Sequence, residues 1–355
     1  MGGTGALRYS FQPGPGQLYP DVPSLIQQAI ESGALVRYHR EPFWQALYLR
    51  AQEAVKAFLG VPADWLVAFL SSATQIWQIL ADATAEETCL HLLQGDFGKR
   101  WYARQKALSS FAYAYEVRPE EPWEAHLAKL QARYSSVHTL CAIQVETSVG
   151  GYLPDLASLR IAFPETLILV DACSSLGGLQ LPWAKVDGVF ASVQKCLGLP
   201  AGLSILLLSP RAIERFAVLS PLRYDALPLL IEKAQQAQPL HTPNLLGIYL
   251  LAHSLPQRPP IEKIEASLCQ RAAYLYKAMR SKGYEPLLPE AYCAPTVLAF
   301  QAPSEQDLAR LRIQLEAEGF YLGWGYGEKR ASTFRLANFP ALPDEAYDQL
   351  LALLP

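Results

Sequence analysis

The sequence predicts an α/β protein: a large domain with a mainly parallel central sheet sandwiched by helices, followed by a small C-terminal α+β domain. From residue 66 to residue 208, short apolar runs bounded by turn residues alternate with longer segments of helical pattern. This alternation is typical of parallel sheets whose strands are joined by crossover helices. A second observation is the linker-like segment 257–260, which contains two consecutive prolines and precedes a separate set of helices and short strands. We therefore expect an arm at 1–20 that packs with the small domain, the large domain at 21–256 and the small domain at 257–355.

Short apolar runs that end in turn residues define the expected strands of the large domain. They cover 66–70, 89–93, 112–117, 138–145 and 166–170, with one further run on each side of Lys195. Expected helices begin at capping residues or prolines and end at a turn residue, as between Asp21 and Gly33. Further helices are expected at 43–60, after 71–74, after 95–100, at 122–134 and 156–163, within 209–255, at 261–282 and 304–318, and from 343, and the small domain adds strands at 295–300, 320–322 and 333–337.

The composition argues against several classes of function. Apolar residues make up 51% of the 355 residues and the formal net charge is −3, which favours a large folded core and indicates no nucleic-acid surface. The apolar runs are too short to span a membrane, and no apolar signal stretch follows Met1. Six cysteines are scattered singly, without the close spacing of a metal site, which is typical of free thiols in a reducing compartment. We expect no metal, no nucleic-acid or membrane partner, and a cytoplasmic location.

Polar side chains gather at the ends of the expected strands or in the loops that follow them. They lie at 71–74, 95–97, Thr147-Ser148, Asp171 and Gln194-Lys195. In open α/β sheets, ligands bind outside the carboxyl ends of the strands. The sequence therefore predicts one pocket that holds a lysine, a carboxylate, an aromatic ring and several hydroxyl groups.

Lys195 and Asp171 are the strongest candidates for chemistry. Taken alone, Lys195 could be a surface lysine in a turn between two buried strands, and Asp171 could be an aspartate that caps a turn. At neighbouring strand ends, however, the two side chains suit pyridoxal 5′-phosphate (PLP). The lysine would form a Schiff base with the aldehyde carbon, and the carboxylate would keep the pyridine nitrogen protonated so that the ring acts as an electron sink.

Four other sites carry weaker signals, each with a structural alternative. Ser72-Ala73-Thr74 could cap a helix or bind a phosphate on the same backbone amides. Phe97 could be a core residue or could stack on a cofactor ring. His39-Arg40 could be a solvated pair or a cationic clamp for an anionic group. Arg335 lies in an apolar strand, where a buried guanidinium requires an anion such as a substrate carboxylate.

A series of motifs along nearly the whole chain resembles the class V aminotransferases, which are PLP enzymes of fold type I, and within them the phosphoserine aminotransferase branch. Ser192-Val193-Gln194-Lys195 is similar to the family's signature around the Schiff-base lysine. The other matching segments are 11–16, His39-Arg40, 95–100, 146–148, 170–175, 241–244 and 334–338.

The resemblance implies a role for individual residues in these motifs. Lys195 and Asp171 would be catalytic, Arg335 would bind the substrate carboxylate, and His39-Arg40 would bind the substrate phosphate. The loop with His241 and Thr242 would reach the partner's cofactor in a homodimer with shared active sites. The residues that would bind PLP are Ser72, Ala73, Thr74, Phe97, Thr147, Ser148, Asp171, Cys173, Gln194, Lys195, His241 and Thr242.

The activity that the resemblance implies is transamination of 3-phosphohydroxypyruvate and L-glutamate to O-phospho-L-serine and 2-oxoglutarate, a step of serine biosynthesis. Two departures from the family pattern bear on this expectation. The turn 71–74 lacks the usual glycines, and the segment 171–177 is closer to the alanine–glyoxylate branch. One alternative is therefore a transaminase of the alanine–glyoxylate or serine–pyruvate type, and a second is a non-catalytic scaffold protein.

Overall fold

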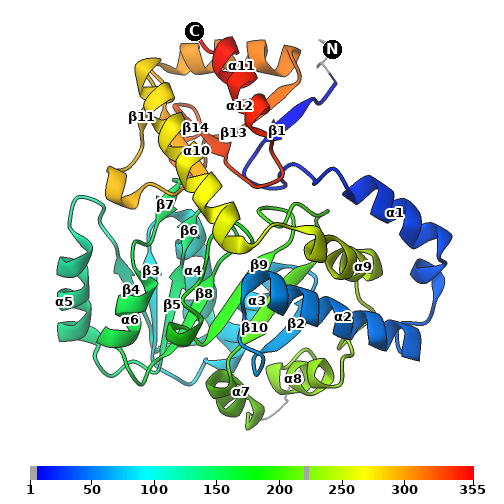
Figure 1. Cartoon of the computed structure of the whole chain (residues 1–355). Helices are drawn as coiled ribbons and strands as arrows, with labels where there is room; N and C mark the ends of the chain where they lie inside the picture. The colour runs from blue at the N-terminus through cyan, green and yellow to red at the C-terminus, as the bar shows by residue number, and fades with distance from the viewer. Residues whose placement is uncertain (1–5, 220–223) are drawn as a thin grey trace.

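The largest sheet of the protein has seven strands and fills the lower half of the view in Figure 1. The computed structural model describes residues 6–219 and 224–355. Six of its strands are buried along their whole length, as their apolar sequences predict. The edge strand at 112–116 buries only its first residue, Ala112. In spatial order the strands are β2 (Leu66–Leu70), β10 (Ser204–Leu208), β9 (Gly188–Ser192), β8 (Leu167–Asp171), β5 (Thr139–Ile143), β3 (Cys89–Leu93) and β4 (Ala112–Glu116).

All neighbouring strands from β9 to β4 are parallel, and β10 is the one strand of this sheet that runs antiparallel to its neighbours. The register pairs Asp171, the last residue of β8, with Phe190 of β9. The chain then turns back after Ser192, so Lys195 lies in the connection between β9 and β10. Asp171 and Lys195 therefore follow neighbouring strands at the same edge of the sheet.

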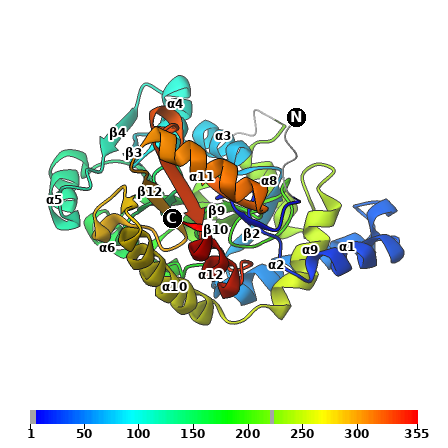
Figure 2. The ribbon, with the colours of Figure 1, turned by 90° about the horizontal axis from the view of Figure 1, so that it is seen from above.

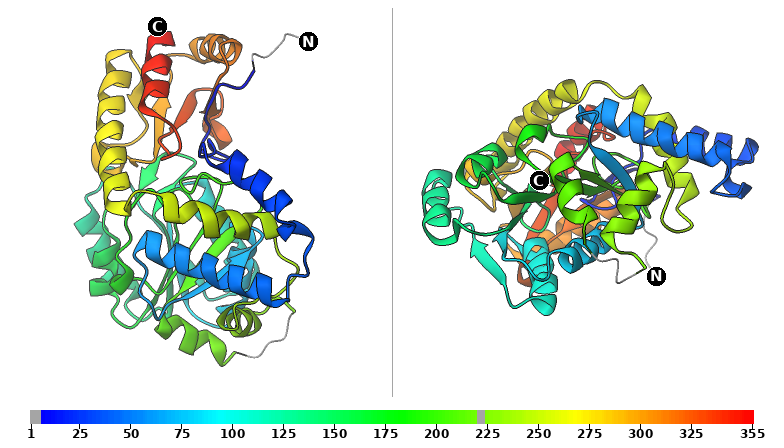
Figure 3. Two further views of the ribbon diagram at one scale, coloured as in Figure 1. Left: turned by 45° about the vertical axis from the view of Figure 1, so that its right-hand side comes forward. Right: turned by 90° about the horizontal axis from the view of Figure 1, so that it is seen from below.

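Helices cover both faces of this sheet, and alternate strand residues face the two layers. Val170, for example, packs in the core under one layer, whereas Leu169 packs under the other. Figure 3 shows α2 and α9 of the first layer side by side. The first layer contains α1 (Val22–Glu31), α2 (Pro42–Leu59), α5 (Trp123–Tyr134), α6 (Leu156–Ala162) and α9 (Leu245–Ser254), and the second contains α3 (Ala73–Ala83), α4 (Asp96–Leu108), α7 (Pro210–Ala217) and α8 (Leu227–Gln235).

A second sheet of five strands lies above the first, and Figure 2 looks onto this part with its helices toward the viewer. Its order is β1 (Tyr9–Phe11), β13 (Phe320–Trp324), β14 (Thr333–Ala337), β12 (Val297–Gln301) and β11 (Glu285–Pro286). The strand β1 comes from the N-terminal arm and pairs in parallel with β13, while the other pairs are antiparallel. Three helices share the core of this sheet, namely α10 (Ile261–Ser281), α11 (Glu305–Ala317) and α12 (Asp344–Leu353).

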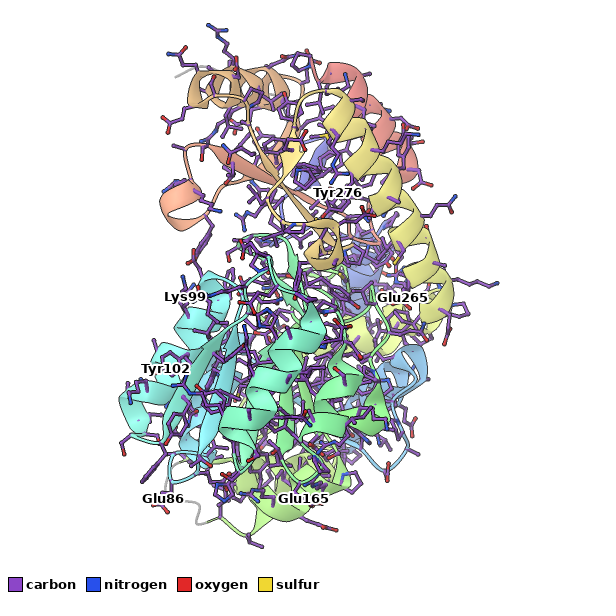
Figure 4. All side chains as sticks on the ribbon, turned by 90° about the vertical axis from the view of Figure 1, so that its left-hand side faces the viewer. Glu86, Lys99, Tyr102, Glu165, Glu265 and Tyr276 are labelled. Atoms are coloured by element: carbon purple, nitrogen blue, oxygen red, sulfur yellow. The ribbon has the colours of Figure 1, made fainter. Side chains whose placement is uncertain are left out.

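The long helix α10 ties the two sheets together (Figure 4). Near its start, Glu265 accepts a hydrogen bond from the side chain of Gln180 in the lower part. Farther along, the hydroxyl of Tyr276 donates to the carbonyl oxygen of Ala294, at a distance of 3.0 Å. None of the helices in the described parts of the chain combines the length and the apolar character needed to cross a membrane.

The α/β fold class with a mainly parallel sheet is confirmed, and the expected strands differ from the observed ones mainly at their ends. The expected strand 138–145 is shorter, because its neighbour β8 ends at Asp171 and leaves nothing beyond Ile143 to pair with. The next residues instead form a small hairpin of β6 (Val145–Glu146) and β7 (Gly151–Tyr152). Residues 1–5 of the expected arm lie outside the described residues, and the division into domains stays a prediction.

Candidate active site

A cavity of about 500 Å³ lies at the edge of the seven-stranded sheet where Asp171 and Lys195 follow their strands. Its floor comes from the ends of β8 and β9, and one wall comes from the first turns of α3 and α4. The opposite wall comes from the arm, at residues 12–15, and from β13 and β14 of the second sheet. The cavity is therefore built by segments from the beginning, middle and end of the chain.

Most of the residues that the sequence suggested for the site line this cavity, and the others do not. Ser148 lies behind the wall, and His39-Arg40 and His241-Thr242 lie elsewhere on the same chain. The suggested residues that line the cavity are Ser72, Ala73, Thr74, Phe97, Thr147, Asp171, Cys173, Gln194, Lys195 and Arg335.

The amine of Lys195 is held by two hydroxyl groups. Its Nζ atom donates to Thr147 Oγ1 at 3.0 Å and to Ser174 Oγ at 2.9 Å, and it lies 5.6 Å from the centre of the Phe97 ring. Among the residues that the structure describes, Lys195 forms no ion pair. Neutral partners fix the position of the amine without tying it to a carboxylate, so it stays available to a ligand. Ser174 was not among the suggested site residues.

Asp171 is a buried carboxylate with two hydrogen-bond donors. Its side chain is 3% exposed, and its Oδ1 atom accepts from the backbone N–H of Cys173 at 2.9 Å. The indole N–H of Trp77 donates to Oδ2, also at 2.9 Å. Burial raises the pKa of Asp171, while the donors and the nearby Lys195 oppose this effect. Asp171 is thus a fixed acceptor in a poorly solvated site.

The first turn of α3 offers backbone N–H groups to the cavity. Ser72 caps the helix, and its hydroxyl accepts from the backbone N–H of Gln75 at 3.1 Å. Ala73 and Thr74 follow in the first turn, where N–H groups have no acceptor within the helix and attract an anion. The missing glycines do not remove this property, because every non-proline residue supplies a backbone N–H.

Glu146 fixes the start of α4, which carries Phe97. Its buried carboxylate accepts from the backbone N–H groups of Phe97 at 3.3 Å and Gly98 at 3.0 Å. It also accepts from the hydroxyl of Ser148, which in turn accepts from the backbone of Asp96. The hydroxyl of Ser148 therefore supports the wall of the cavity rather than lining it. Burial raises the pKa of Glu146. The sequence did not indicate a role for Glu146, because it served only as part of the matching segment 146–148.

Arg335 is a buried cation that faces the cavity without an acidic partner among the described residues. Its side chain donates to the carbonyl oxygens of Thr147 at 3.1 Å and Trp324 at 2.7 Å. Its Nε atom is buried and has no hydrogen-bond partner within residues 6–219 and 224–355. Burial lowers the pKa of Arg335, as expected for a charge removed from water. The guanidinium is therefore ready to bind a carboxylate from a ligand.

The two motifs that do not line the cavity, His39-Arg40 and the loop with His241 and Thr242, lie close to each other. The guanidinium of Arg40 donates to the side chain of Gln238 at 3.2 Å and to the carbonyl oxygen of Leu240 at 3.5 Å. His241 and Thr242 follow directly and line a small separate pocket with Ser71. We call Arg40 and residues 238–242 the outer cluster. Within one chain, the outer cluster is not part of the lining of the main cavity.

The residues of the cavity fit PLP. Two buried polar atoms at this cavity, Gln194 Oε1 and Arg335 Nε, have no hydrogen-bond partner in the described parts of the chain, which is typical of a site shaped for a polar ligand. Lys195 would take the aldehyde carbon, Asp171 the pyridine nitrogen and the first turn of α3 the phosphate. Across the described residues, no three His, Cys, Asp or Glu side chains are grouped so that they could hold a metal ion.

The comparisons with known proteins agree with this site. The family model described as "Aminotransferase class-V" matches residues 8–311. The crystal structure of a phosphoserine aminotransferase from Cytophaga hutchinsonii is 30% identical, with a TM-score of 0.89 and coverage of 98% of both chains. The phosphoserine aminotransferase of Rhodococcus jostii is 24% identical over 96% of this chain and 92% of its own length. The structure of an alanine–glyoxylate aminotransferase from Nostoc sp., 22% identical, covers 100% of this chain and 96% of its own with a TM-score of 0.82. The chain thus belongs to the class V aminotransferases and is a transaminase that depends on PLP.

Proposed function

We propose that the protein converts 3-phosphohydroxypyruvate and L-glutamate into O-phospho-L-serine and 2-oxoglutarate, as a step of serine biosynthesis. The observation that carries the proposal is Arg335, a buried cation without an acidic partner in the cavity that holds Lys195. All four compounds have an α-carboxylate that this guanidinium would bind. Support for the phosphorylated substrate comes from Arg40 in the outer cluster and from the names of the relatives.

Each residue at the cavity has a task that follows from its position. When bound, PLP supplies an electron sink that makes the α-proton of the substrate acidic. The amine of Lys195, oriented by Thr147 and Ser174, takes that proton from the α-carbon and returns it to the cofactor carbon C4′. Asp171 would accept the hydrogen bond of the protonated pyridine nitrogen, and the ring of Phe97 would pack against the cofactor.

We also propose a homodimer in which the outer cluster of one chain completes the site of the other. His39-Arg40 and His241-Thr242 do not line the cavity of their own chain, and Arg40 joins the segments of the outer cluster through hydrogen bonds to Gln238 and Leu240. A mixture of Lys195→Ala subunits with subunits carrying His39→Ala and Arg40→Ala tests this proposal. The Lys195→Ala variant alone should be inactive and the other variant alone should react slowly with phosphoserine. In a hybrid dimer, one of the two active sites should have Lys195, His39 and Arg40 intact and regain activity. No recovery after subunit exchange would contradict a shared site.

A second candidate function is a transaminase for small amino acids, of the alanine–glyoxylate or serine–pyruvate type. The observation that favours it is the cavity lining, in which Lys195 and Arg335 are the basic residues among those described. Without a contribution from a partner, the cavity then has no further cation for a substrate phosphate. Membership in the aminotransferase family argues against the non-catalytic scaffold.

The substrate proposal is tested by half-reactions of the loaded enzyme with phosphoserine, glutamate, alanine and serine. We expect rapid conversion of the cofactor by phosphoserine and glutamate. Replacing His39 and Arg40 with alanine should slow the reaction with phosphoserine much more than the reaction with alanine. Equal losses for both amino acids would favour the second candidate.

We propose a cytoplasmic location. All six cysteines are free thiols, which is typical of proteins in a reducing compartment. Fractionation of cells followed by immunoblotting tests this location, and recovery of the protein outside the cytoplasmic fraction would contradict it.

A further inference from the structure

Trp77 contacts the carboxylate of Asp171 from a neighbouring helix. The residue belongs to α3, its side chain is 6% exposed, and it lines the cavity beside Asp171. Its indole N–H donates to Asp171 Oδ2 at 2.9 Å. The other carboxylate oxygen is held locally, by the backbone N–H of Cys173 only two residues away. Trp77 therefore supplies the hydrogen bond that connects Asp171 to another element of the fold.

The same helix presents the opposite end of the site. Ala73 and Trp77 are four residues apart in α3, so they lie on one face of the helix. Both line the cavity. The first turn at Ala73 is where a phosphate would bind, and Trp77 lies one turn farther along, at the carboxylate for the pyridine nitrogen. One rigid element thus sets the distance between the two ends of the cofactor site.

The orientation of the Trp77 ring is fixed by its neighbours. It is nearly parallel to the ring of Trp101, with centroids 6.3 Å apart and an angle of 10° between the planes. Trp101 in turn meets the ring of Phe190 edge-on at 5.3 Å, and Phe190 is the strand partner of Asp171. Asp171, Trp77, Trp101 and Phe190 therefore form a closed ring of contacts. The indole of Trp77 cannot turn its N–H away from Asp171 without disturbing this part of the core.

We propose that Trp77 is a positioning residue for the transaminase reaction: its indole N–H holds Asp171 in the orientation that grips the protonated pyridine nitrogen of PLP. A hydrogen bond to a charged group contributes more than one between neutral groups. Burial raises the pKa of Asp171, and the indole N–H favours the ionised carboxylate in the same direction as the larger effects of Cys173 and Lys195. In this proposal Trp77 acts through Asp171 and does not bind the substrate.

The test compares cofactor binding by the apo protein and four variants, without substrate. Equilibrium dialysis measures the dissociation constants of PLP and of its 1-deaza analogue, in which a C–H group replaces the ring nitrogen. Trp77→Phe removes the donor and keeps a ring, and we expect it to weaken PLP about ten-fold and to leave the analogue unchanged. Trp101→Phe is the matched control, because the indole nitrogen of Trp101 is buried and has no hydrogen-bond partner among the residues that the structure describes. It should leave the ratio of the two constants unchanged.

The ratio of the two dissociation constants is measured on folded protein only, so a lower yield of Trp77→Phe leaves the test intact. The remaining two variants are Asp171→Asn alone and Asp171→Asn combined with Trp77→Phe. In the background of Asp171→Asn, the replacement of Trp77 should cause no further change in the ratio of the two dissociation constants. An equal loss for PLP and its analogue, or no loss for PLP, would overturn the proposal and leave Trp77 as a packing residue. The inference depends on the PLP chemistry of the family and not on the proposed substrate. The cofactor-binding test can therefore fail while the half-reactions with phosphoserine succeed, and the reverse.

Discussion

Replacement of Arg335 by lysine should impair every amino-acid substrate by a similar factor. A guanidinium carries five N–H donors, and Arg335 uses two of them on the carbonyl oxygens of Thr147 and Trp324. The remaining donors, including the unpartnered Nε, can bind both oxygens of a carboxylate. A single ammonium group cannot satisfy both carbonyls and also hold two carboxylate oxygens. We expect the loss of one charge-assisted hydrogen bond, worth about 1.5–3 kcal/mol, which corresponds to a decrease of about 10- to 150-fold in kcat/KM.

Stopped-flow half-reactions with glutamate, phosphoserine and alanine measure this effect one substrate at a time. The three amino acids share the α-carboxylate and differ in the side chain, so the decrease should be nearly the same for all of them. The dissociation constant of PLP serves as the control and should not change. A decrease limited to phosphoserine would refute the assignment, because Arg335 would then bind the substrate's side chain rather than its α-carboxylate.

Three further predictions follow from the same region. Lys195→Ala should abolish transamination and the visible absorption of lysine-bound PLP, and a retained absorption band would show that another residue holds the cofactor. Gly14→Ala should lower the free energy of unfolding by about 1–3 kcal/mol in urea titrations, because Gly14 has a φ of +148° and a Cβ atom there would lie 3.0 Å from Lys195 Cε; an unchanged midpoint would contradict this. Glu146→Gln should gain stability relative to the wild type as the pH rises above 4.5, the ordinary pKa of the carboxyl group. Burial raises the pKa of Glu146 in the folded state, so its contribution to stability is present at lower pH and is lost as the pH rises through the folded value. Melting temperatures across this pH range check the sign, and a constant difference would be inconsistent with the raised pKa.

The strand ends could be predicted from the sequence because the central strands are covered on both faces. Such strands read as continuous apolar runs, and a polar residue that ends a run marks the end of the strand. Asp171 follows four apolar residues and ends β8, and Lys195 follows β9 within a few residues. The rule that ligands bind at the carboxyl ends of strands then grouped these residues without any knowledge of their contacts.

The contacts between distant segments could not be predicted in this way. Trp77 reads as a core residue of an amphipathic helix, and its hydrogen bond to Asp171 depends on how α3 packs against the sheet. Arg40 reads as a solvated loop residue, and its contact with Gln238 joins segments that are far apart in the chain. Hydrophobic periodicity predicts which face of a helix or strand is buried, but it does not predict which polar atom of a distant segment will contact that face.

The pairing of β1 with β13 has a consequence for any shortened form of the protein. Tyr9 and Phe320 are register partners, although almost the whole chain separates them. A fragment cut at the linker before α10 would therefore leave β13 with an unprotected edge, which invites association with other chains. The residues just after β1 also contact the segment that carries Lys195, since Gly16 donates its backbone N–H to the carbonyl oxygen of Gln194. Deletion of the chain up to Gly16 would thus expose the edge of β13 and also remove the part of the cavity lining that residues 12–15 supply.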